Sequence, residues 1–463
     1  MSRIHTHADR RSFLAHSARL ATLGASPFAT SFATNLALMG GAMAQSVPTG
    51  EYRALVCVYL GGGNDNANTV VPVSATEHAH YASARGALTL SVAQLEATRI
   101  SPLGYSGPAL ALHPSLSKLR ERFNKGQAAV VANVGVLNRA ISKAEWNNGR
   151  PKVDVPYQLF SHSDQSREWQ TGVADAQVPT GWLGRAGDAL QALNASKVSI
   201  CMSLGGNNAI QVGKDVVQYQ ITTKGPVPIN ALASPYGVNT PALRNVLTSE
   251  TRVNLMEREL TRIARRAITN EALIRDAIVP TSTLAEFPGG GLGAQLRMVA
   301  RMIAAQSTLG HARQIFYVSH GGYDFHADLL ENQATKLAEL DVALEQFQLQ
   351  MALLGMSEKV TTFTMSEFGR ALQSNGAGSD HGWGGHHFVL GGAVKGQQVY
   401  GQWPEVKLKG PEDAGNGRLI PTTAVDSYAA TLATWLGVKA DALDTVLPRL
   451  NRFATRNLGF MNA

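Results

Sequence analysis

Four short stretches of the chain are rich in apolar residues and end in glycine or polar residues. They are residues 54–60, 128–136, 314–319 and 359–365. A parallel strand covered by helices on both faces has this pattern, because neither of its faces meets water. The sequence therefore predicts four buried strands.

Helical segments lie between these strands. Residues 114–124 begin with a proline and are followed by Gly126, residues 292–309 end at Gly310, and residues 337–354 carry apolar side chains spaced by three and four. Strands that alternate with helices predict an α/β fold, with a mostly parallel central sheet and helices on both faces.

A long charged stretch, residues 240–279, separates the two halves of this pattern. It is followed by a loop that carries three consecutive glycines, Gly289 to Gly291. We predict a helical insertion over residues 240–291 within one α/β domain spanning residues 45–463.

The first residues carry an export signal. Arg10 and Arg11 form a twin-arginine motif, an interrupted apolar stretch follows over residues 20–41, and Ala42 to Ala44 provide a small-x-small cleavage site. We predict that residues 1–44 are a signal peptide, which is cleaved after Ala44. The mature chain would then be located in the periplasm or be secreted. The apolar stretch is too interrupted for a stable membrane span, so we do not expect an integral membrane protein.

Composition narrows the function further. The net charge is only +7 and no Lys/Arg run is present, which argues against a nucleic-acid partner. The mild positive charge is compatible with an anionic substrate. Cys57 and Cys201 lie in apolar runs, so we expect buried free thiols. Neither lies in the C-x-P-x-R context from which sulfatases make formylglycine.

Ionisable residues follow three of the predicted strands. Because ligands bind beyond the carboxyl ends of strands in open α/β sheets, we expect these side chains to share one edge. In chain order they are Asp65, then His320, Asp324 and His326, then Glu367, and finally Asp380, His381, His386 and His387 in what we predict to be a glycine-rich loop. Carboxylates mixed with imidazoles suit zinc, manganese or a similar divalent ion.

Each element alone has an ordinary alternative. Asp65 after three glycines can form an Asx turn or a helix cap, and Glu367 can pair with Arg370 one turn away. The metal-site prediction depends on all of these groups occurring together.

Several motifs resemble one known family. The twin-arginine leader and the segments GGGNDNANTVVP, SHSDQSREWQTG, GGYDFH, SEFGR and DHGWGGHHFVLGG resemble the exported bacterial family called domain of unknown function 1501. That family is grouped with the alkaline phosphatase and sulfatase superfamily, so the resemblance implies an alkaline phosphatase-like fold and a two-metal hydrolase.

The resemblance also implies roles for individual residues. Metal ligands would be Asp65, Asp324, His326, Glu367, Asp380, His381 and either His386 or His387, with His320 as an alternative to His326. Thr69 would be the attacking group, and His162 and Arg370 would contact substrate. The cofactors would be divalent ions: zinc, manganese, magnesium or calcium.

Two functions remain open at this stage. The first is an exported metal-dependent hydrolase of phosphate or sulfate esters, acting on an anionic ester or a cell-envelope component. The second is a binding or assembly protein that keeps the sulfatase-like fold without turnover, which the irregular ligand spacing and the doubtful attacking group favour.

Overall fold

The computed structural model describes residues 50–148, 155–229, 232, 240–249, 251 and 254–462. The predicted signal peptide, residues 1–44, and its cleavage site lie outside these residues. Pro48–Ala463 forms one compact unit, and all that follows concerns this unit.

A ten-stranded sheet forms its centre. The strand order is β14-β5-β13-β10-β1-β9-β6-β7-β8, with β15 also paired to β5. The strands are β1 (Arg53–Gly61), β5 (Ala128–Gly135), β6 (Cys201–Ser203), β7 (Tyr219–Thr222), β8 (Gly225–Pro226), β9 (Arg313–Gly321), β10 (Val360–Met365), β13 (Gly385–Leu390), β14 (Val399–Tyr400) and β15 (Thr423–Ala424). β1 is parallel to both neighbours, β9 and β10, whereas β13 is antiparallel to β10 and β5. The four predicted strands are therefore present, in a mostly parallel sheet.

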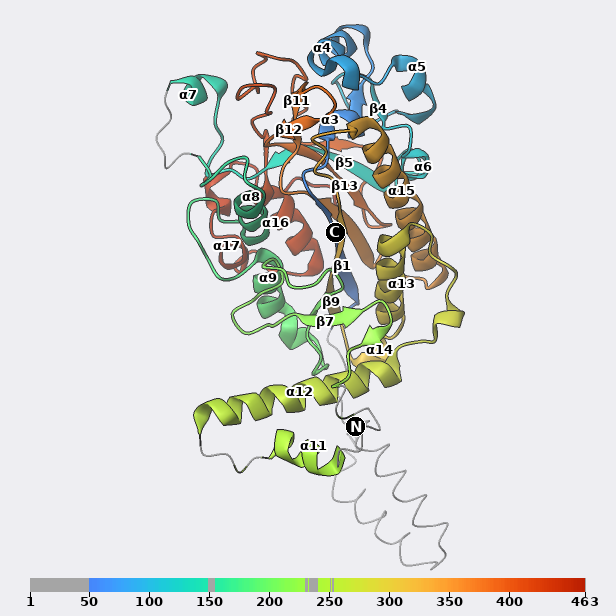
Figure 1. The fold of residues 1–463 in the computed structure, drawn as a ribbon, viewed down its shortest axis with the longest axis vertical. Coiled ribbons are helices and arrows are strands. Elements are labelled where there is room, and N and C mark those ends of the chain that lie inside the picture. The colour runs from blue at the N-terminus through green and yellow to red at the C-terminus, as the bar shows by residue number, and fades with distance from the viewer. Residues whose placement is uncertain are drawn as a thin grey trace, which may run out of the picture. The chain divides into compact units, whose positions relative to one another are not determined.

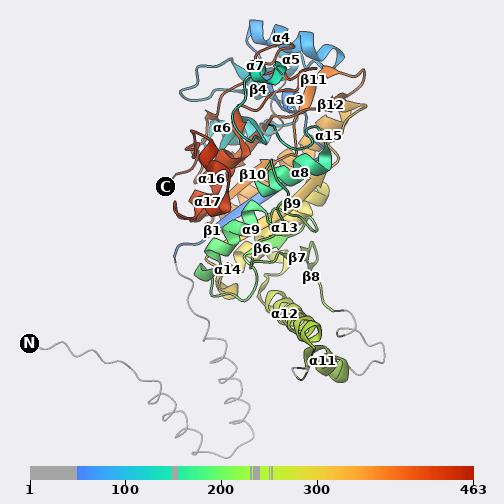
Figure 2. The same cartoon turned by 90° about the vertical axis from the view of Figure 1, so that its left-hand side faces the viewer.

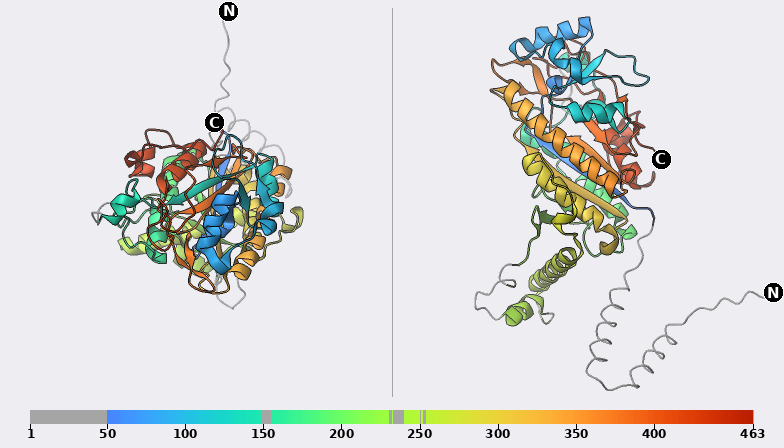
Figure 3. Two further views of the ribbon diagram at one scale, coloured as in Figure 1. Left: turned by 90° about the horizontal axis from the view of Figure 1, so that it is seen from above. Right: turned by 90° about the vertical axis from the view of Figure 1, so that its right-hand side faces the viewer.

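Successive side chains of β1 enter two different cores, as the pleat of a strand requires. Val56 and Val58 pack in the core with the helices α13 (Gly290–Ala304) and α15 (Leu329–Leu353). Leu55 and Cys57 pack in the core with the helices α9 (Trp182–Leu190) and α16 (Val425–Leu436). The prediction of helices on both faces is thereby confirmed (Figures 1 and 3). Cys57 and Cys201 are buried free thiols, as expected.

The α-helices alternate with these strands. They are α3 (Asn66–Thr69), α4 (Ala75–Arg85), α5 (Val92–Leu95), α6 (Ser117–Asn124), α7 (Lys143–Asn147), α8 (His162–Thr171), α9 (Trp182–Leu190), α11 (Thr240–Thr248), α12 (Leu255–Ala277), α13 (Gly290–Ala304), α14 (Gln306–Leu309), α15 (Leu329–Leu353), α16 (Val425–Leu436) and α17 (Leu443–Val446). Two small sheets, β2 (Val70–Pro72) with β3 (Arg99–Ile100) and β4 (Leu110–Leu112), and β11 (Arg370–Ser374) with β12 (Ser379–His381), complete the fold.

The histidine-rich stretch after β10 is not one loop, which corrects the prediction. It contains the β11–β12 hairpin and then β13, whose six residues are all buried between β10 and β5. Its glycines allow close packing rather than mobility: a Cβ at Gly384 would lie 1.9 Å from Asn133 Oδ1.

The predicted insertion contains the helices α11 and α12 (Figure 2). The second half of α12 contacts the rest of the unit, where Asn270 and Ile274 are buried. Within the described residues, no helix combines the length and apolar character needed to cross a membrane.

Gly62, directly after β1, provides a test of the turn that shapes this sheet edge. Its φ is +118°, and a Cβ would lie 2.5 Å from the Asp324 nitrogen. We expect Gly62→Ala to lower the free energy of unfolding by about 2 kcal/mol or more, measured by urea unfolding. Gly321→Ala is the matched control, because its Cβ would find no atom closer than 4.0 Å. A loss of equal size in both variants would contradict this account.

Candidate metal centre

The site lies where β1, β9 and β10 end together. In the parallel register Gly61 of β1 lies beside Gly321 of β9, and Tyr59 lies beside Met365 of β10. The segments after these strands, the β11–β12 hairpin and the first residue of α8 all contribute side chains to the site. The predicted convergence at one sheet edge is therefore present for the residues described next.

Glu367, two residues after β10, is buried and accepts three hydrogen bonds. Its Oε1 accepts from the Gly62 N–H at 2.9 Å and from His162 Nδ1 at 2.8 Å, and its Oε2 accepts from the Tyr59 hydroxyl at 3.0 Å. The carboxylate is 3% exposed. Since its neighbours already use both oxygens, Glu367 serves to position His162 rather than to bind a ligand itself.

His162 is the first residue of α8. Ser161 caps this helix by accepting a hydrogen bond from the Asp164 N–H, which fixes the helix start and the position of His162. Because a carboxylate can only accept, His162 Nδ1 must donate to Glu367, and this hydrogen bond raises the pKa of His162. The Nε2 atom is left facing Asp324.

His381, at the end of β12, is held in the same manner. Its Nδ1 lies 2.8 Å from the carbonyl oxygen of Phe160, so this nitrogen also carries the proton. Burial lowers the pKa of His381 and favours the neutral ring, with a free lone pair on Nε2. Phe160 has a φ of +70°, a left-handed conformation that is unusual for a side chain of this size and that presents its carbonyl to the histidine.

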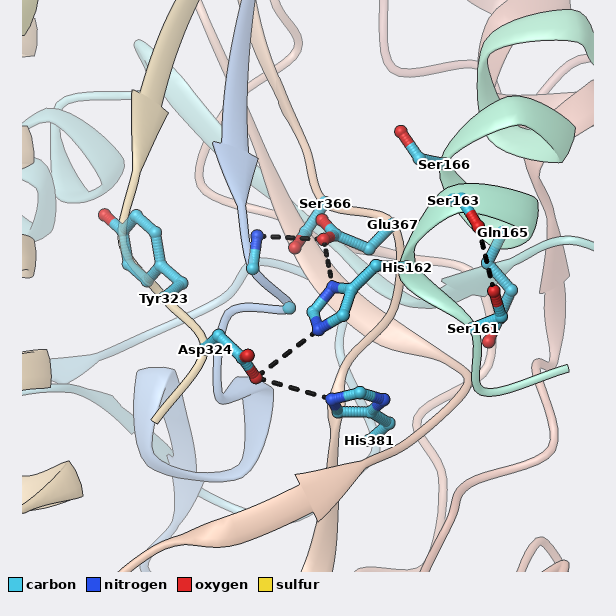
Figure 4. Close-up of polar contacts among 12 residues, drawn as sticks. Ser161, His162, Ser163, Gln165, Ser166, Tyr323, Asp324, Ser366, Glu367 and His381 are labelled. Carbon is cyan, nitrogen blue, oxygen red and sulfur yellow. Dashed lines mark hydrogen bonds and ion pairs between the residues drawn. The ribbon is translucent and has the colours of Figure 1, made fainter. Parts of the chain in front are cut away.

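Three ligand atoms meet at Asp324, in the segment after β9 (Figure 4). His162 Nε2 and His381 Nε2 each lie 3.4 Å from Asp324 Oδ1. In a four-coordinate zinc site with bonds of roughly 2.0–2.1 Å, neighbouring ligand atoms lie roughly 3.3 Å apart. His162 Nε2 is also shielded from solvent and has no hydrogen-bond partner among the described residues. The chemistry and spacing of these atoms therefore fit a divalent cation.

His326 lies beside this triad. Its Nε2 is 3.0 Å from both Asp324 Oδ1 and His381 Nε2, and its Nδ1 is 3.6 Å from Asp380 Oδ1. Because His381 Nε2 carries a lone pair, the short contact requires a proton on His326 Nε2. The side chains of His326 and Asp380 are about half exposed, so both are in contact with solvent.

Arg370 links the loops that carry these groups. Its buried guanidinium donates to the carbonyl oxygens of Gly62, Gly63, Tyr323 and Ser379, and to Asp324 Oδ1. Burial tends to raise the pKa of Asp324, but the hydrogen bond and the charge of Arg370, together with the charges of His162 and His326, lower this pKa overall and favour the ionised carboxylate. Since its guanidinium is buried and held by these five acceptors within the chain, Arg370 is a positioning residue and not the substrate contact that we predicted.

Asp65 and Thr69 do not reach the site, which corrects both predictions. Asp65 is fully buried and forms an ion pair with buried Arg85 on α4. Burial raises the pKa of Asp65, and Arg85 offsets part of that rise. The Thr69 hydroxyl is also fully buried: it donates to the Asp65 carbonyl oxygen at 2.7 Å and accepts from Gln333 Nε2 at 3.2 Å. Neither group is available to a ligand.

The histidines of β13 are likewise in the core, which corrects a third prediction. His386 stacks on Trp403 and accepts from the Asn133 N–H, whereas His387 packs against Trp169. Burial lowers the pKa of each to about 3, so both are neutral packing residues. His320 also points elsewhere, with its nitrogens at Tyr323 and Glu339.

Sequence reasoning missed three contributors. Tyr59 lies inside β1 and Phe160 acts through its backbone, so neither carries a recognisable motif. Arg418 donates to the His381 carbonyl oxygen and stacks over Phe160 at 4.8 Å, although it lies 37 residues beyond His381. Only the folded chain brings Arg418 to His381, so no local sequence signal marks it.

Comparison with known proteins gives one family and several distant structures. The family model described as "Protein of unknown function (DUF1501)" matches residues 52–426. No sequence among the curated proteins matches the chain.

Three solved structures illustrate the structural comparison. The lipoteichoic acid synthase LtaP from Listeria monocytogenes is 7% identical with a TM-score of 0.32, covering 89% of this chain and 75% of its own. Lipooligosaccharide phosphoethanolamine transferase A from Neisseria meningitidis is 11% identical with a TM-score of 0.31, covering 88% and 96%. A 2-O glycosaminoglycan sulfatase is 11% identical with a TM-score of 0.31, covering 86% and 75%.

The buried pair of Asp65 and Arg85 can be tested separately from the site. Removing the arginine leaves a carboxylate in the core without a cation, so we expect Arg85→Met to lower the free energy of unfolding by about 3–5 kcal/mol. Arg99→Met, which breaks an exposed pair with Glu96, is the control and should cost less than about 1 kcal/mol. Chemical denaturation of both variants measures the difference, and a loss below about 1 kcal/mol for Arg85→Met would argue against a structural role.

Proposed function

The chain belongs to the DUF1501 family of proteins of unknown function, and on that premise we propose that it is an exported, metal-dependent hydrolase of anionic esters. The proposed cation is held by His162, Asp324 and His381. The supporting observation is that both histidines have Nδ1 committed to an oxygen acceptor while both Nε2 atoms face Asp324 Oδ1. Histidines that bind metals are oriented in this manner by their other ring nitrogen.

A bound divalent cation would supply Lewis acidity, polarising an ester oxygen and lowering the pKa of a water molecule. The residues of the chain would supply the rest. Arg418, next to His381, would attract the anionic group of the ester. His326, with Asp380 beside it, would deliver the proton from its Nε2 to the departing alkoxide.

We propose one cation and an attacking water rather than two cations and an attacking hydroxyl. Glu367 and Asp65 would be needed for a second cation, but Glu367 holds His162 and Asp65 holds Arg85. Thr69 is buried behind Gln333 and cannot approach a substrate. In the proposed hydrolysis, water would add to phosphorus or sulfur as the bond to the ester oxygen breaks, and the departing oxygen would take the proton of His326. The proton lost by the attacking water would pass to the solvent, from which His326 would regain one.

The burial of Thr69 also favours the second candidate, a protein that binds without turnover. In that case the same three ligands would hold a cation as part of a recognition surface for an anionic cell-envelope component. Metal binding is common to both candidates, and only turnover distinguishes them.

Three histidine variants separate the proposed roles. We expect His381→Ala to lose the bound cation, whereas His326→Ala keeps the cation and loses turnover of esters whose leaving group needs a proton. His80→Ala is the control, since His80 also lies near a glutamate, Glu405, but outside the site. Metal content of the untagged mature protein, by elemental analysis after loading with Zn²⁺ or Mn²⁺, gives the first readout.

The leaving group gives the second readout. Because a nitrophenolate leaves without a proton, His326→Ala should slow hydrolysis of an alkyl phosphate or sulfate by roughly 10²–10⁴-fold and that of the nitrophenyl ester by less than roughly tenfold. Equal losses on both esters would argue against proton donation. A metal-loaded wild type without turnover of either ester class would favour the binding protein, and a wild type that takes up no cation would reject both candidates.

Export is proposed from the leader alone. We expect replacement of Arg10 and Arg11 by lysine to hold the precursor in the cytoplasm, since the twin-arginine route reads the arginine pair. Cell fractionation followed by immunoblotting measures this, with Arg3→Lys as the control outside the pair. Normal export of the double variant would show that the leader uses another route.

A further inference from the structure

One face of α12 is apolar except at Asn270, and it is buried only in the second half of the helix. Residues spaced by three and four along this face are Met256, Leu260, Ile263, Ala267, Asn270 and Ile274. Asn270 and Ile274 are buried against the rest of the unit, whereas Met256 to Ala267 are exposed. We call these four exposed residues, Met256, Leu260, Ile263 and Ala267, the α12 stripe.

The α12 stripe belongs to a concentration of exposed apolar side chains on α11 and α12. Met256 is 79% exposed, Leu260 63% and Ile263 54%, and Leu255 on α12 and Val246 on α11 are exposed as well. These five are nearly half of the eleven large hydrophobic side chains that are exposed in the described part of the chain. Clustered exposure of this kind marks an interaction surface rather than chance.

We propose that the α12 stripe pairs with the α12 stripe of a second copy of this chain, with the two helices antiparallel. In this register Leu260 of each copy packs on Ile263 of the other, and Met256 packs on Ala267. The contact is isologous, so one patch suffices to form a closed dimer.

The charges beside the stripe favour this occupant. Glu259 and Arg266 precede Leu260 and Ala267 and lie on the same flank of the stripe. In an antiparallel pair the equivalent flanks face each other, so Glu259 of each copy meets Arg266 of the other. Glu259 is paired with Arg262 within its own chain, but that pair is solvent-exposed and easily exchanged.

The position of the helix in the fold favours the antiparallel direction. The rest of the unit contacts α12 from Asn270 onwards, through α14 and β8. If the two α12 helices were parallel, the remainder of both copies would lie at the same end of the helix pair. If they are antiparallel, the two copies lie at opposite ends of the pair. Figure 2 shows α11 and α12 beyond β7 and β8, away from the other strands of the sheet.

A membrane surface fits the α12 stripe less well. Arg266 shares one flank with Glu259, but the other flank carries Glu257 and has no cation beside the stripe. An interfacial helix would need cations there to meet anionic head groups. We therefore commit to the second copy and leave vesicle binding as an outcome of the test.

Sedimentation velocity of the mature protein, from about 1 to 100 µM, tests the proposal. We expect a concentration-dependent dimer with a dissociation constant on the order of micromolar, as small interfaces give. Leu260→Glu combined with Ile263→Glu should weaken the dimer by roughly 100-fold or more. Leu353→Glu, at an equally exposed leucine on α15, should leave it unchanged. Thermal unfolding of each variant checks that the fold is intact.

A charge exchange tests the register. Glu259→Arg alone and Arg266→Glu alone should each weaken the dimer, and the double variant should restore it, because both inter-copy pairs are re-formed with reversed sign. A monomeric wild type at 100 µM would overturn the proposal, and so would a dimer that survives Leu260→Glu with Ile263→Glu. A monomer that binds phosphatidylglycerol vesicles through the stripe would assign the surface to a membrane instead. Failure of the double exchange to restore pairing would reject the antiparallel register.

Discussion

The candidate site depends on one buried guanidinium. Arg370 has five N–H groups, and they are distributed over the segments after β1 and β9 and over β12. The segments after β1 and β9 are irregular backbone whose carbonyl groups would otherwise be buried without donors. A planar, permanently charged fork can satisfy several of them at once, whereas lysine could not. Without Arg370, no single side chain would hydrogen-bond to all three segments, and Asp324 would lose the partner that orients its carboxylate.

A second layer of control acts through hydrogen bonds to the far side of each imidazole. Glu367 and the Phe160 carbonyl fix which nitrogen of His162 and His381 is protonated, and so fix which nitrogen faces Asp324. The carboxylate of Glu367 is shielded from water and also held by Tyr59 and the Gly62 amide. In such surroundings these bonds are stronger than at the surface, so the geometry is set before any ligand arrives.

The sequence predicted the fold and about half of the site, for identifiable reasons. The strands were evident because a helix-covered strand is apolar on both faces, and the shared edge followed from their parallel direction. The environment of each polar side chain could not be read in this way. Nothing near Asp65 in sequence announces that Arg85, at the far end of α4, turns back to pair with it. The pair His386 and His387 resembled ligands in a glycine-rich loop, yet those glycines allow a buried strand to pack closely against β5.

The contacts of Arg370 also bear on the order of events during synthesis. Its partners Gly62 and Gly63 are more than 300 residues earlier in the chain, and Tyr323 and Asp324 are more than 40 residues earlier. Until the ribosome has released the segment containing Arg370 and His381, the glycine turn after β1 has neither its donor nor its final conformation. Contacts of such high sequence separation form late and slowly. An amino-terminal fragment that ends before Arg370 therefore cannot form the candidate site, and a newly made chain cannot bring His162, Asp324 and His381 together until most of its length has emerged.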